Sequence, residues 1–466
     1  MVLPKRFKSL IPKRFKSLKA GCSEATPYKR ETFNSMPLCY YQMANDMDSL
    51  DVIIIGGGLA GLTTAVLLAR SGKAVTLFEH SSREIGGRAR TTVIDGFYFN
   101  QGPHALYITD AADSILKEIG ITYTGGILAG KAYLISGGKK REIALGDYSS
   151  WLSGKSDGSQ FFISPAKIDF SQLESVTAQE WLDKNIHDIN DAEIIKTIIR
   201  NNTYGNDPDI QSIGPVLHQI YVANRGGGVM YLDGGWQTLV DGLLTVAKNA
   251  NARIVMGKKA IRVKRNDSSG WQVLLDNKTE VSAKIVVIAA GPNDAYNLFD
   301  DNERPDVLSK AAKEAKPIRL VCLDVALSSL PDKDTLFALG VDRPLYFSVH
   351  SAYAKLAPKG GALIHVAKYL ETSIQPKPRE DEPELEEFLD LLQPGWRQVL
   401  VKKRPLPNMV VSNALVTAAE GGLGGRPDTK IAENLYIVGD WVGKEGLLSN
   451  ASVASAKRAS QQILNR

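Results

Sequence analysis

The sequence predicts an α/β fold, because two strand patterns, a glycine-rich turn and a helical pattern follow one another early in the chain. The β-branched run Asp51–Ile55 is typical of a strand buried in a parallel sheet. The turn Gly56–Gly61 follows directly, and the apolar segment Leu62–Arg70 predicts a helix. Ala74–Glu79 predicts the next strand. This order of elements is the βαβ unit from which parallel sheets are built.

The turn has the spacing GxGxxG, which indicates a dinucleotide-binding site when a strand precedes it and a helix follows it. Gly56 permits the tight turn, Gly58 lets the backbone approach a pyrophosphate, and Gly61 lets the helix and the strand pack closely. Leu59 and Ala60 lie where the N-terminus of the helix offers unpaired N–H groups to phosphates. A glycine-rich turn that binds no ligand is the alternative.

Glu79 ends the second predicted strand, 18 residues after Gly61. A carboxylate at this position can accept hydrogen bonds from both hydroxyls of a ribose, and its charge disfavours a 2′-phosphate. The nucleotide is therefore expected to be FAD or NAD rather than NADP. A separate NAD(P)H site would need a second unit of this kind. Gly421–Arg426 has the glycines, but no strand precedes them, so we expect a loop there.

The charge of the chain is unevenly distributed. The chain has 466 residues, of which 44% are hydrophobic and 23% are charged, and its formal net charge is +5. This composition excludes collagen-like, fully disordered and disulfide-scaffold proteins. Residues 1–50 carry nine basic and four acidic side chains, whereas the other 416 residues carry 47 of each. A neutral body argues against nucleic-acid binding.

Residues 1–50 are predicted to form a basic, low-complexity and disordered leader. It contains LPKRFKSL at 3–10, repeated as IPKRFKSL at 11–18, and it has no apolar run long enough for secretion. We therefore expect a cytoplasmic protein. Three interpretations of the leader stay open: a transit-like segment, an arm that contacts anionic lipid, and an extension upstream of a true translation start at Met43 or Met47.

The sequence lacks the patterns of metal and hydrolytic sites. Cys22, Cys39 and Cys322 form no CxxC pair, so neither a zinc site nor a disulfide framework is expected. There is also no Ser/His/Asp arrangement and no metal-ligand cluster at recognisable spacing. We expect no bound metal.

Two motifs that follow the second strand carry a family resemblance. The first is Gly86-Gly87-Arg88, and the second is Gly96–His104, which ends in Gly102-Pro103-His104. They resemble the flavin-containing superfamily of amine oxidases, protoporphyrinogen oxidases and phytoene-type carotenoid desaturases. The resemblance implies that Arg88 pairs with the FAD pyrophosphate, that the two glycines before it bring backbone near the flavin, and that the second motif ends beside the isoalloxazine ring. Arg83 either lines the adenosine or is a solvated surface residue.

The C-terminal segment is similar to the same family. Asn434–Asp440 predicts a strand that closes on Gly439-Asp440, and a helix is predicted from about Ser449 to Leu464. The resemblance implies that Asp440 binds the ribityl or phosphate region of FAD. It also implies that the segment before the helix, Gly446-Leu447-Leu448, lies at the flavin. A helix N-terminus there would stabilise the negative charge of a reduced flavin.

A third match, Tyr231–Leu243, resembles the helix start that precedes the second flavin-domain segment. In the family, the next strand, near Ile261 here, contacts adenine through its main chain. Together the matches imply a discontinuous, Rossmann-like FAD-binding domain. This domain would consist of residues 51–105, 230–292 and 405–466. The remaining segments, 106–229 and 293–404, are expected to form an inserted α+β substrate domain.

The sequence does not identify a general base. His104 is the one histidine in a motif implied to touch the flavin, and it either relays a proton, orients substrate or is structural. His365, on a predicted strand, faces either the cavity or the core. Tyr231, Trp236 and Trp441 either line the substrate pocket or belong to the core.

The leading hypothesis is an FAD-dependent oxidoreductase similar to phytoene desaturases, which oxidises a hydrophobic organic substrate by hydride transfer to flavin N5. The FAD is expected to be non-covalent, because no cysteine follows Cys322 for a C-terminal link. Two alternatives stay open: an amine or amino-acid oxidase that uses oxygen and releases hydrogen peroxide, and a non-catalytic flavin-binding protein. The expected partner is a hydrophobic small molecule, and peripheral contact with a membrane is a further option.

Deletion of all residues before Met43 is expected to leave FAD binding unchanged, because every motif that resembles the flavin family lies after this residue. The absorbance spectra of the purified full-length and truncated proteins measure their flavin contents. Loss of flavin in the truncated protein would show that the leader belongs to the fold.

Overall fold

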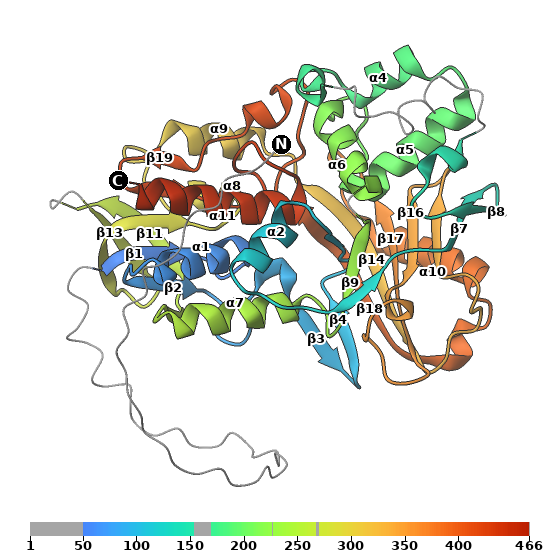
Figure 1. Ribbon diagram of the computed structural model, residues 1–466, viewed down its shortest axis with the longest axis horizontal. Coiled ribbons are helices and arrows are strands. Elements are labelled where there is room, and N and C mark those ends of the chain that lie inside the picture. The colour runs from blue at the N-terminus through green and yellow to red at the C-terminus, as the bar shows by residue number, and fades with distance from the viewer. Residues whose placement is uncertain (1–49, 153–168, 226, 267–269, 466) are drawn as a thin grey trace, which may run out of the picture. The chain divides into compact units, whose positions relative to one another are not determined.

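A computed structural model describes residues 50–152, 169–225, 227–266 and 270–465 (Figure 1). The predicted leader, including its tandem repeat, Cys22, Cys39 and the two candidate start residues Met43 and Met47, lies outside the described residues. Among the helices of the described part, none is both long enough and apolar enough to cross a membrane.

The largest sheet within the described residues has eight strands in a mixed arrangement. Five of them are mutually parallel: β10 (Arg253–Met256), β2 (Val75–Glu79), β1 (Leu50–Ile55), β13 (Glu280–Ile288) and β20 (Leu435–Ile437). The other three each pair with a neighbour in antiparallel orientation, so that β11 runs in the same direction as the first five: β12 (Trp271–Leu275) with β13, β11 (Ala260–Arg265) with β12, and β19 (Lys430–Ala432) with β20. The sheet therefore joins segments from the beginning, the middle and the end of the chain.

Both faces of this sheet are covered, as the continuous apolar sequence of β1 predicts. Val52 and Ile54 point to one face and Ile53 and Ile55 to the other, because successive side chains of a strand alternate. The first face packs against α1 (Leu59–Arg70), α2 (Ala111–Glu118), α7 (Gln237–Asn249) and α11 (Leu448–Leu464) (Figure 1). The second packs against α8 (Pro292–Tyr296) and α9 (Asp306–Glu314).

The first helix begins three residues earlier than the sequence predicts. Gly58 is its N-cap residue, and the carbonyl of Gly58 accepts a hydrogen bond from the N–H of Leu62 (2.9 Å). The prediction placed the start at Leu62 because the glycine-rich turn was assigned up to Gly61. The backbone of Leu59 and Ala60 is already helical, so both residues belong to the first turn of α1.

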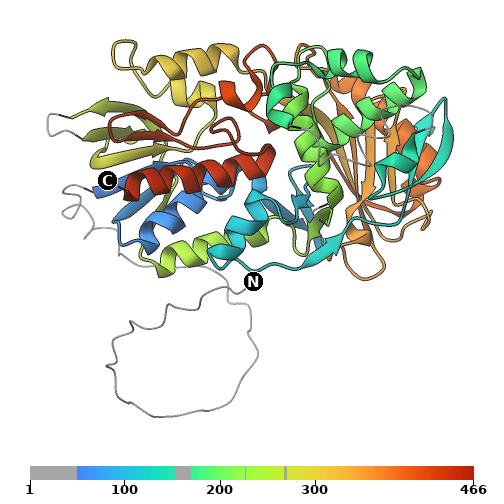
Figure 2. The same ribbon diagram turned by 45° about the horizontal axis from the view of Figure 1, so that its top comes forward.

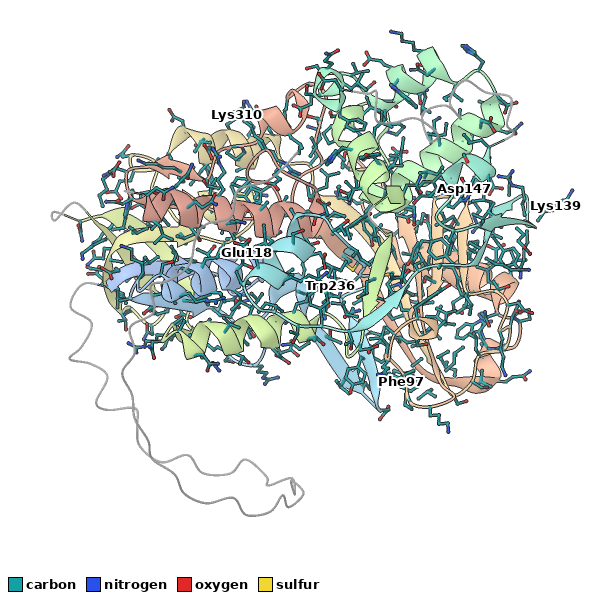
Figure 3. The ribbon with its side chains drawn as sticks, in the orientation of Figure 1. Phe97, Glu118, Lys139, Asp147, Trp236 and Lys310 are labelled. Carbon is teal, nitrogen blue, oxygen red and sulfur yellow. The ribbon has the colours of Figure 1, made fainter. Side chains whose placement is uncertain are left out.

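A second sheet has seven strands within the described residues, in the order β18-β14-β17-β16-β15-β7-β8. Neighbouring strands are antiparallel except β15 and β7. The strands are β7 (Lys131–Ser136), β8 (Lys139–Ala144), β14 (Ile318–Leu327), β15 (Phe337–Gly340), β16 (Leu345–Val349), β17 (Ala362–Tyr369) and β18 (Leu400–Ser412). Lys139, at the tip of the β7–β8 hairpin, projects away from the fold (Figure 3).

Helices cover both faces of the second sheet as well. One face packs against α4 (Ala178–Asn185), α5 (Ile189–Thr203) and α6 (Ile213–Arg225), the green helices of Figure 2. The other face packs against α10 (Pro378–Leu392). Two small sheets complete the strands: the hairpin of β3 (Thr91–Ile94) and β4 (Phe97–Asn100), and the set of β5 (Leu106–Tyr107), β9 (Val229–Leu232) and β6 (Gly125–Ile127).

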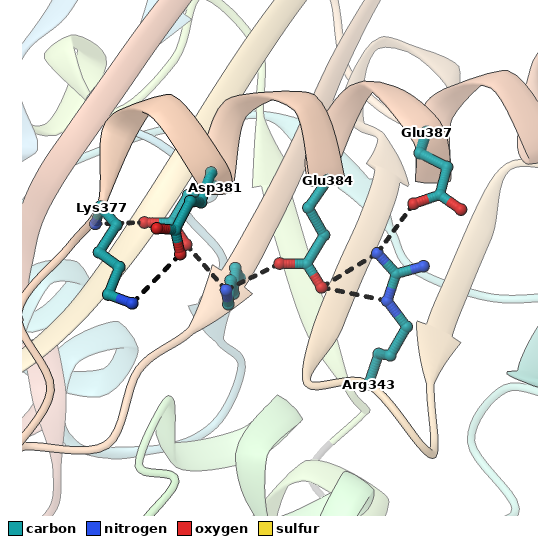
Figure 4. A network of polar contacts seen from close by, with 7 residues as sticks. Arg343, Lys377, Asp381, Glu384 and Glu387 are labelled. Atoms are coloured by element: carbon teal, nitrogen blue, oxygen red, sulfur yellow. Dashed lines mark hydrogen bonds and ion pairs between the residues drawn. The ribbon is translucent and has the colours of Figure 1, made fainter.

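A row of ion pairs fixes α10 on the second sheet (Figure 4). Lys368 of β17 contacts Asp381 (2.8 Å) and Glu384 (2.7 Å) on the helix. Arg343 contacts Glu384 (3.0 Å) and Glu387 (3.2 Å) one turn further along. The apolar residues of α10 face the sheet. Its acidic side chains therefore lie at the edge of the contact, where Lys368 and Arg343 neutralise them.

Asp381→Ala is expected to lower the free energy of unfolding by about 2 kcal/mol, since a hydrogen bond to a charged group contributes about 1.5–3 kcal/mol. The Asp381 side chain is 4% exposed, and it accepts hydrogen bonds from the Lys368 ammonium and from the Lys377 N–H. Glu387→Ala is the matched control, because the Glu387 side chain is 70% exposed, and it should change stability by less than about 0.5 kcal/mol. Urea unfolding measures both variants, and equal losses would contradict the role of Asp381.

Candidate functional site

In the glycine-rich turn after β1, Gly56 and Gly61 pack closely against other backbone atoms, whereas Gly58 borders open space. A Cβ on Gly56 would lie 2.6 Å from the carbonyl oxygen of Ala289, and a Cβ on Gly61 would lie 2.0 Å from the carbonyl oxygen of Gly56. Neither position can carry a side chain without a shift of backbone. A Cβ on Gly58, in contrast, would meet no atom within 4 Å. The backbone of Gly58 therefore borders open space.

Glu79 lies beside this turn and is held in place by its neighbours. Its side chain is 7% exposed, and one carboxylate oxygen accepts a hydrogen bond from the N–H of Gly57 (2.8 Å). The other oxygen accepts from the N–H of Ser81 (2.9 Å) and lies 2.8 Å from Nδ1 of His80. The oxygen that accepts from Gly57 has a further lone pair, so the group can still accept a hydrogen bond from a ligand hydroxyl.

The second glycine motif touches the first. The N–H of Gly86 donates to the carbonyl of Gly57 (2.9 Å), and a Cβ on Gly87 would lie 3.4 Å from the Cα of Gly58. Both Gly86 and Gly87 have positive φ angles, of 117° and 56°, which glycine adopts without strain. Two segments that are about 30 residues apart thus form one glycine-lined surface.

Arg88 follows directly and makes an ion pair with the buried carboxylate of Asp440. The Arg88 guanidinium donates to the Asp440 carboxylate (2.9 Å) and to the carbonyl of Val411 (2.7 Å). Asn413 donates to the same carboxylate from its backbone N–H (2.9 Å) and its amide (2.7 Å). Burial alone would raise the pKa of Asp440, but Arg88 and Asn413 outweigh it and lower this pKa to about 2. Asp440 is therefore ionised at neutral pH.

The start of α11 lies near this ion pair and beside a second arginine, Arg426, which is half-buried. Leu447 is the N-cap residue and Leu448 the first residue of the helix. The guanidinium of Arg426 donates to the carbonyl of Gly446 (2.9 Å), while its Nε is buried and has no hydrogen-bond partner within the described residues. Burial lowers the pKa of Arg426 to about 10. Arg426, Leu447 and Leu448 line a cavity of about 310 Å³.

Gly102-Pro103-His104 connects this region with the second sheet. A Cβ on Gly102 would lie 2.3 Å from the sulfur of Met409 and 3.5 Å from that of Cys322, so the close approach requires glycine. His104 lies 3.1 Å from the carbonyl of Gly102 through Nδ1, and its ring packs edge-on against Trp236 at 4.9 Å between centroids. Burial lowers the pKa of His104 to about 4, so His104 is neutral at neutral pH.

A larger pocket, here called the tyrosine-walled pocket, adjoins this segment. The hydroxyl of Tyr204, which lines the pocket, donates to the carbonyl of Pro103 (3.3 Å). The pocket is partly open to solvent, and none of the described residues that line it is charged. Its lining consists of Ala105, Tyr107, Leu128, Leu145, Gly146, Tyr148, Asn201, Asn202, Tyr204, Ala223, Asn224, Gly228, Val229, Tyr231, Phe337 and Tyr346.

The remaining sequence-predicted residues lie in different environments. Ile261 is the second residue of β11 and is 43% exposed. Tyr231 lines the tyrosine-walled pocket, whereas Trp441 is buried in the core, where its indole N–H donates to the carbonyl of Ala290 (3.0 Å). His365 is buried on β17 against Asp324. The Gly421–Arg426 segment contains a short 3₁₀ turn, Gly422–Gly425.

Sequence reasoning missed Arg426 and the buried side chains that surround His365, which include Asp324, His350 and Tyr346. The signal for Arg426 was present, since this residue ends the glycine-rich segment that was assigned only as a loop. No group of three or more His, Cys, Asp or Glu side chains that could hold a metal ion occurs in the part of the chain that the structure describes.

Comparisons with known proteins agree with this geometry at the level of the family. Residues 59–321 match the model of the flavin containing amine oxidoreductase family. A 4,4′-diapolycopen-4-al dehydrogenase of Metabacillus indicus is 26% identical over 281 residues, which cover 51% of this chain and 55% of that protein. A carotenoid 3,4-desaturase of Haloarcula japonica is 36% identical over 76 residues, 16% of this chain and 15% of that protein. The matches thus span about half, or less, of these relatives' length.

Solved structures show the same fold. An oxidoreductase from Methanosarcina mazei has a TM-score of 0.69 at 19% identity and covers 90% of this chain and 100% of its own. Cyclohexylamine oxidase from Brevibacterium oxydans has a TM-score of 0.66 at 16% identity, with coverages of 90% and 100%. The described chain therefore has the mixed α/β fold, with several sheets, that these proteins share.

Glu79→Ala and Arg88→Ala are both expected to lower the amount of FAD that stays bound through gel filtration, and by more than Arg83→Ala does. Glu79 accepts a hydrogen bond from the glycine-rich turn and Arg88 is fixed by Asp440, whereas Arg83 is an exposed residue outside both glycine motifs. The absorbance of bound flavin per protein measures retention, and Tm shows whether each variant is folded. Equal retention in the three variants would contradict the roles of Glu79 and Arg88.

Proposed function

The chain belongs to the family of flavin-containing amine oxidoreductases and is thus an FAD-dependent oxidoreductase, and we propose that it oxidises an apolar organic substrate by hydride transfer to the flavin. The bound flavin would supply the two-electron acceptor. The protein would contribute orientation of the substrate, a dry cavity and fixed charges around the cofactor.

For FAD binding, we propose roles for the residues that meet around the glycine-lined surface. Glu79 would accept hydrogen bonds from the ribose, and the backbone at Gly58 would face the pyrophosphate. Arg88 would offset phosphate charge while it holds Asp440, which would lie at the ribityl chain. The start of α11, from Gly446 to Leu448, would face the ring. These roles fit the open space at Gly58 and the ionised state of Asp440.

The proposed cofactor domain is Rossmann-like and discontinuous. It would consist of residues 51–105, 230–292 and 405–466, and the substrate domain would consist of 106–229 and 293–404. The mutually parallel strands of the eight-stranded sheet support this division. So does the position of the tyrosine-walled pocket, whose lining comes largely from the second group of segments.

The uncharged lining of the tyrosine-walled pocket is the observation that carries the proposed substrate class. A pocket without charged groups favours an apolar molecule, because apolar surface gains by leaving water. The names of the two carotenoid-converting relatives support a polyene or a similar hydrocarbon.

Amine oxidation is the second candidate, and the tyrosines of the same pocket favour it. Five of its lining residues are tyrosines, and their ring faces attract an ammonium group. An amine oxidase would oxidise an amine, pass the electrons to oxygen and release hydrogen peroxide. Desaturation of a polyene would instead proceed without any amine.

The two functions can be separated with one substitution, Asn224→Asp. Asn224 lines the tyrosine-walled pocket, and its Oδ1 is buried with no hydrogen-bond partner within the described residues. A carboxylate there should raise KM for a polyene at least about tenfold, because an unpaired buried charge costs more than about 1.4 kcal/mol. The same change should lower KM for a cationic amine. Asn190→Asp, at an exposed position, is the matched control and should change neither value.

Anaerobic reduction of the flavin, followed by its absorbance, provides the measurement. An acyclic polyene such as phytoene, dispersed in detergent, is compared with a panel of amines, and peroxide is assayed after oxygen is admitted. Bleaching by the polyene alone supports the proposal, and bleaching by amines with peroxide supports the second candidate. A colourless preparation that takes up no FAD would overturn both, and a flavin that no substrate reduces would favour a non-catalytic role.

A further inference from the structure

The cavity at the start of α11, here called the α11 cavity, has two buried polar groups that the proposed roles do not use. Arg426 lines it from the end of the 3₁₀ turn Gly422–Gly425, and Gln211 lines it from the segment before α6. Nε of Arg426 and Oε1 of Gln211 are buried, and neither atom has a hydrogen-bond partner in the part of the chain that the structure describes. One atom is a donor and the other is an acceptor, so the cavity offers both to a ligand.

Arg426 has a positive charge that its surroundings do not neutralise. Its guanidinium has five N–H donors, and the carbonyl of Gly446 accepts the one hydrogen bond found for it within the described residues. The carboxylate whose charge acts on Arg426 is Asp440, which Arg88 and Asn413 already bind. Arg88, Asp440 and Arg426 together thus keep one net positive charge. Because a partly buried charge without a counter-ion is unfavourable, this charge points to an electron-rich or anionic ligand.

The amide of Gln211 is held so that its oxygen is the free atom. Gln211 is 3% exposed, and its Nε2 lies 3.0 Å from Oγ1 of Thr203. The Thr203 hydroxyl donates its only hydrogen to the carbonyl of Ile199 (2.8 Å). Oγ1 of Thr203 can therefore only accept from Gln211, so the amide atom in contact with it is the nitrogen. Oε1 of Gln211 is then a buried acceptor without a donor, which is unfavourable until a ligand supplies one.

The α11 cavity borders the residues to which we assign the binding of FAD. Ser412 lines the cavity. On one side of Ser412, the carbonyl of Val411 accepts a hydrogen bond from Arg88 (2.7 Å). On the other side, the N–H of Asn413 donates to Asp440 (2.9 Å). The first turn of α11, which is proposed to face the ring of the flavin, lines the cavity as well. The cavity therefore lies where one end of that ring is expected.

We propose that the α11 cavity binds the pyrimidine end of the flavin, with Arg426 donating to the C2=O oxygen and Gln211 accepting from N3–H. This inference rests on the proposed function, because the same flavin would accept the hydride. C2=O and N3–H are neighbours on the ring, so they match a donor and an acceptor that line one cavity. Reduction places negative charge on the N1–C2=O edge, and a fixed cation there stabilises the reduced flavin more than the oxidised flavin.

The first test removes the charge of Arg426 and measures the midpoint potential of the bound FAD. Arg426→Met should weaken the binding of reduced FAD at least about tenfold more than the binding of oxidised FAD. For a two-electron couple, this ratio corresponds to a midpoint potential that is about 30 mV lower. Arg426→Lys keeps the charge and should restore most of the potential. Lys457→Met is the matched control, because it removes a positive charge from α11 about 14 Å beyond its start and should leave the potential unchanged.

Anaerobic titration of the holoprotein with dithionite and a reference dye gives the potential, and Tm shows whether each variant is folded. A wild-type potential in Arg426→Met would overturn the proposal. A shift of the same size in Lys457→Met would overturn it as well, because the effect would then not depend on the position of the charge. If Arg426→Met holds too little FAD to titrate, the second test decides.

The second test pairs Gln211 with the N3 position of the cofactor. In 3-methyl-FAD, a methyl group replaces the N3 hydrogen, so this analogue has no donor there. Wild type should bind FAD at least about tenfold more tightly than 3-methyl-FAD, because the analogue leaves Oε1 of Gln211 buried without a donor. Gln211→Ala lacks the acceptor and has room for the methyl group, so this ratio should fall towards one. Gln219→Ala is the matched control, since Gln219 is 1% exposed but does not line the cavity.

The change in flavin fluorescence on binding to the apoprotein gives both affinities. Equal binding of the two flavins by wild type, or an unchanged ratio in Gln211→Ala, would overturn the proposal. Neither test uses a substrate, so a wrong substrate class changes neither result. A protein that binds no FAD would overturn the proposed cofactor roles together with this inference. Bound FAD with an unchanged potential and an unchanged ratio would overturn this inference alone.

Discussion

The arrangement of the molecule depends on one buried, ionised carboxylate. Asp440 binds Arg88 from the glycine-lined surface and Asn413 from the end of the strand that leads out of the second sheet. A carboxylate that accepts three hydrogen bonds from charged and polar donors resists protonation, and its pKa of about 2 reflects this. The stabilisation that it provides is complete above the pKa of an unfolded aspartate and is lost only as the pH falls towards 2. The two sheets are thus joined by a contact that ordinary acidity leaves intact.

The parts of the site that lie within one continuous segment could be predicted from the sequence. The strand, the glycine turn, the helix and the second strand follow one another between residues 50 and 79, and their spacing alone places Glu79 beside Gly57. Arg88 and Asp440 were named from short motifs, but the sequence did not show that they bind each other, 352 residues apart. The start of α1 was wrong by three residues, because Gly58 caps the helix inside the turn.

The buried contact between His365 and Asp324 could not be predicted, because it forms only through strand register. Asp324 lies opposite His365 in the pairing of β14 with β17, and a shift of β17 by one residue would turn the His365 side chain to the other face, away from Asp324. The alternation of apolar residues around His365 indicates that His365 lies on a strand, but it does not indicate which strand pairs with it. The tyrosine-walled pocket has the same origin, since its lining comes from separate segments between Ala105 and Tyr346. Family membership could therefore be predicted from local motifs. The chemistry of the substrate pocket could not, because the pocket forms only when distant segments come together.

The order in which the strands pair also bears on how the protein is made. The eight-stranded sheet begins with β1 and β2 but contains β19 and β20 near the C-terminus, and the seven-stranded sheet pairs β7 with β15, some 200 residues later. Neither sheet can be completed before these distant strands have been synthesised. Until then the early strands keep unpaired edges, and unpaired edges favour aggregation. Contacts between strands so far apart in sequence also slow folding, so the dispersed topology predicts slow closure of both sheets.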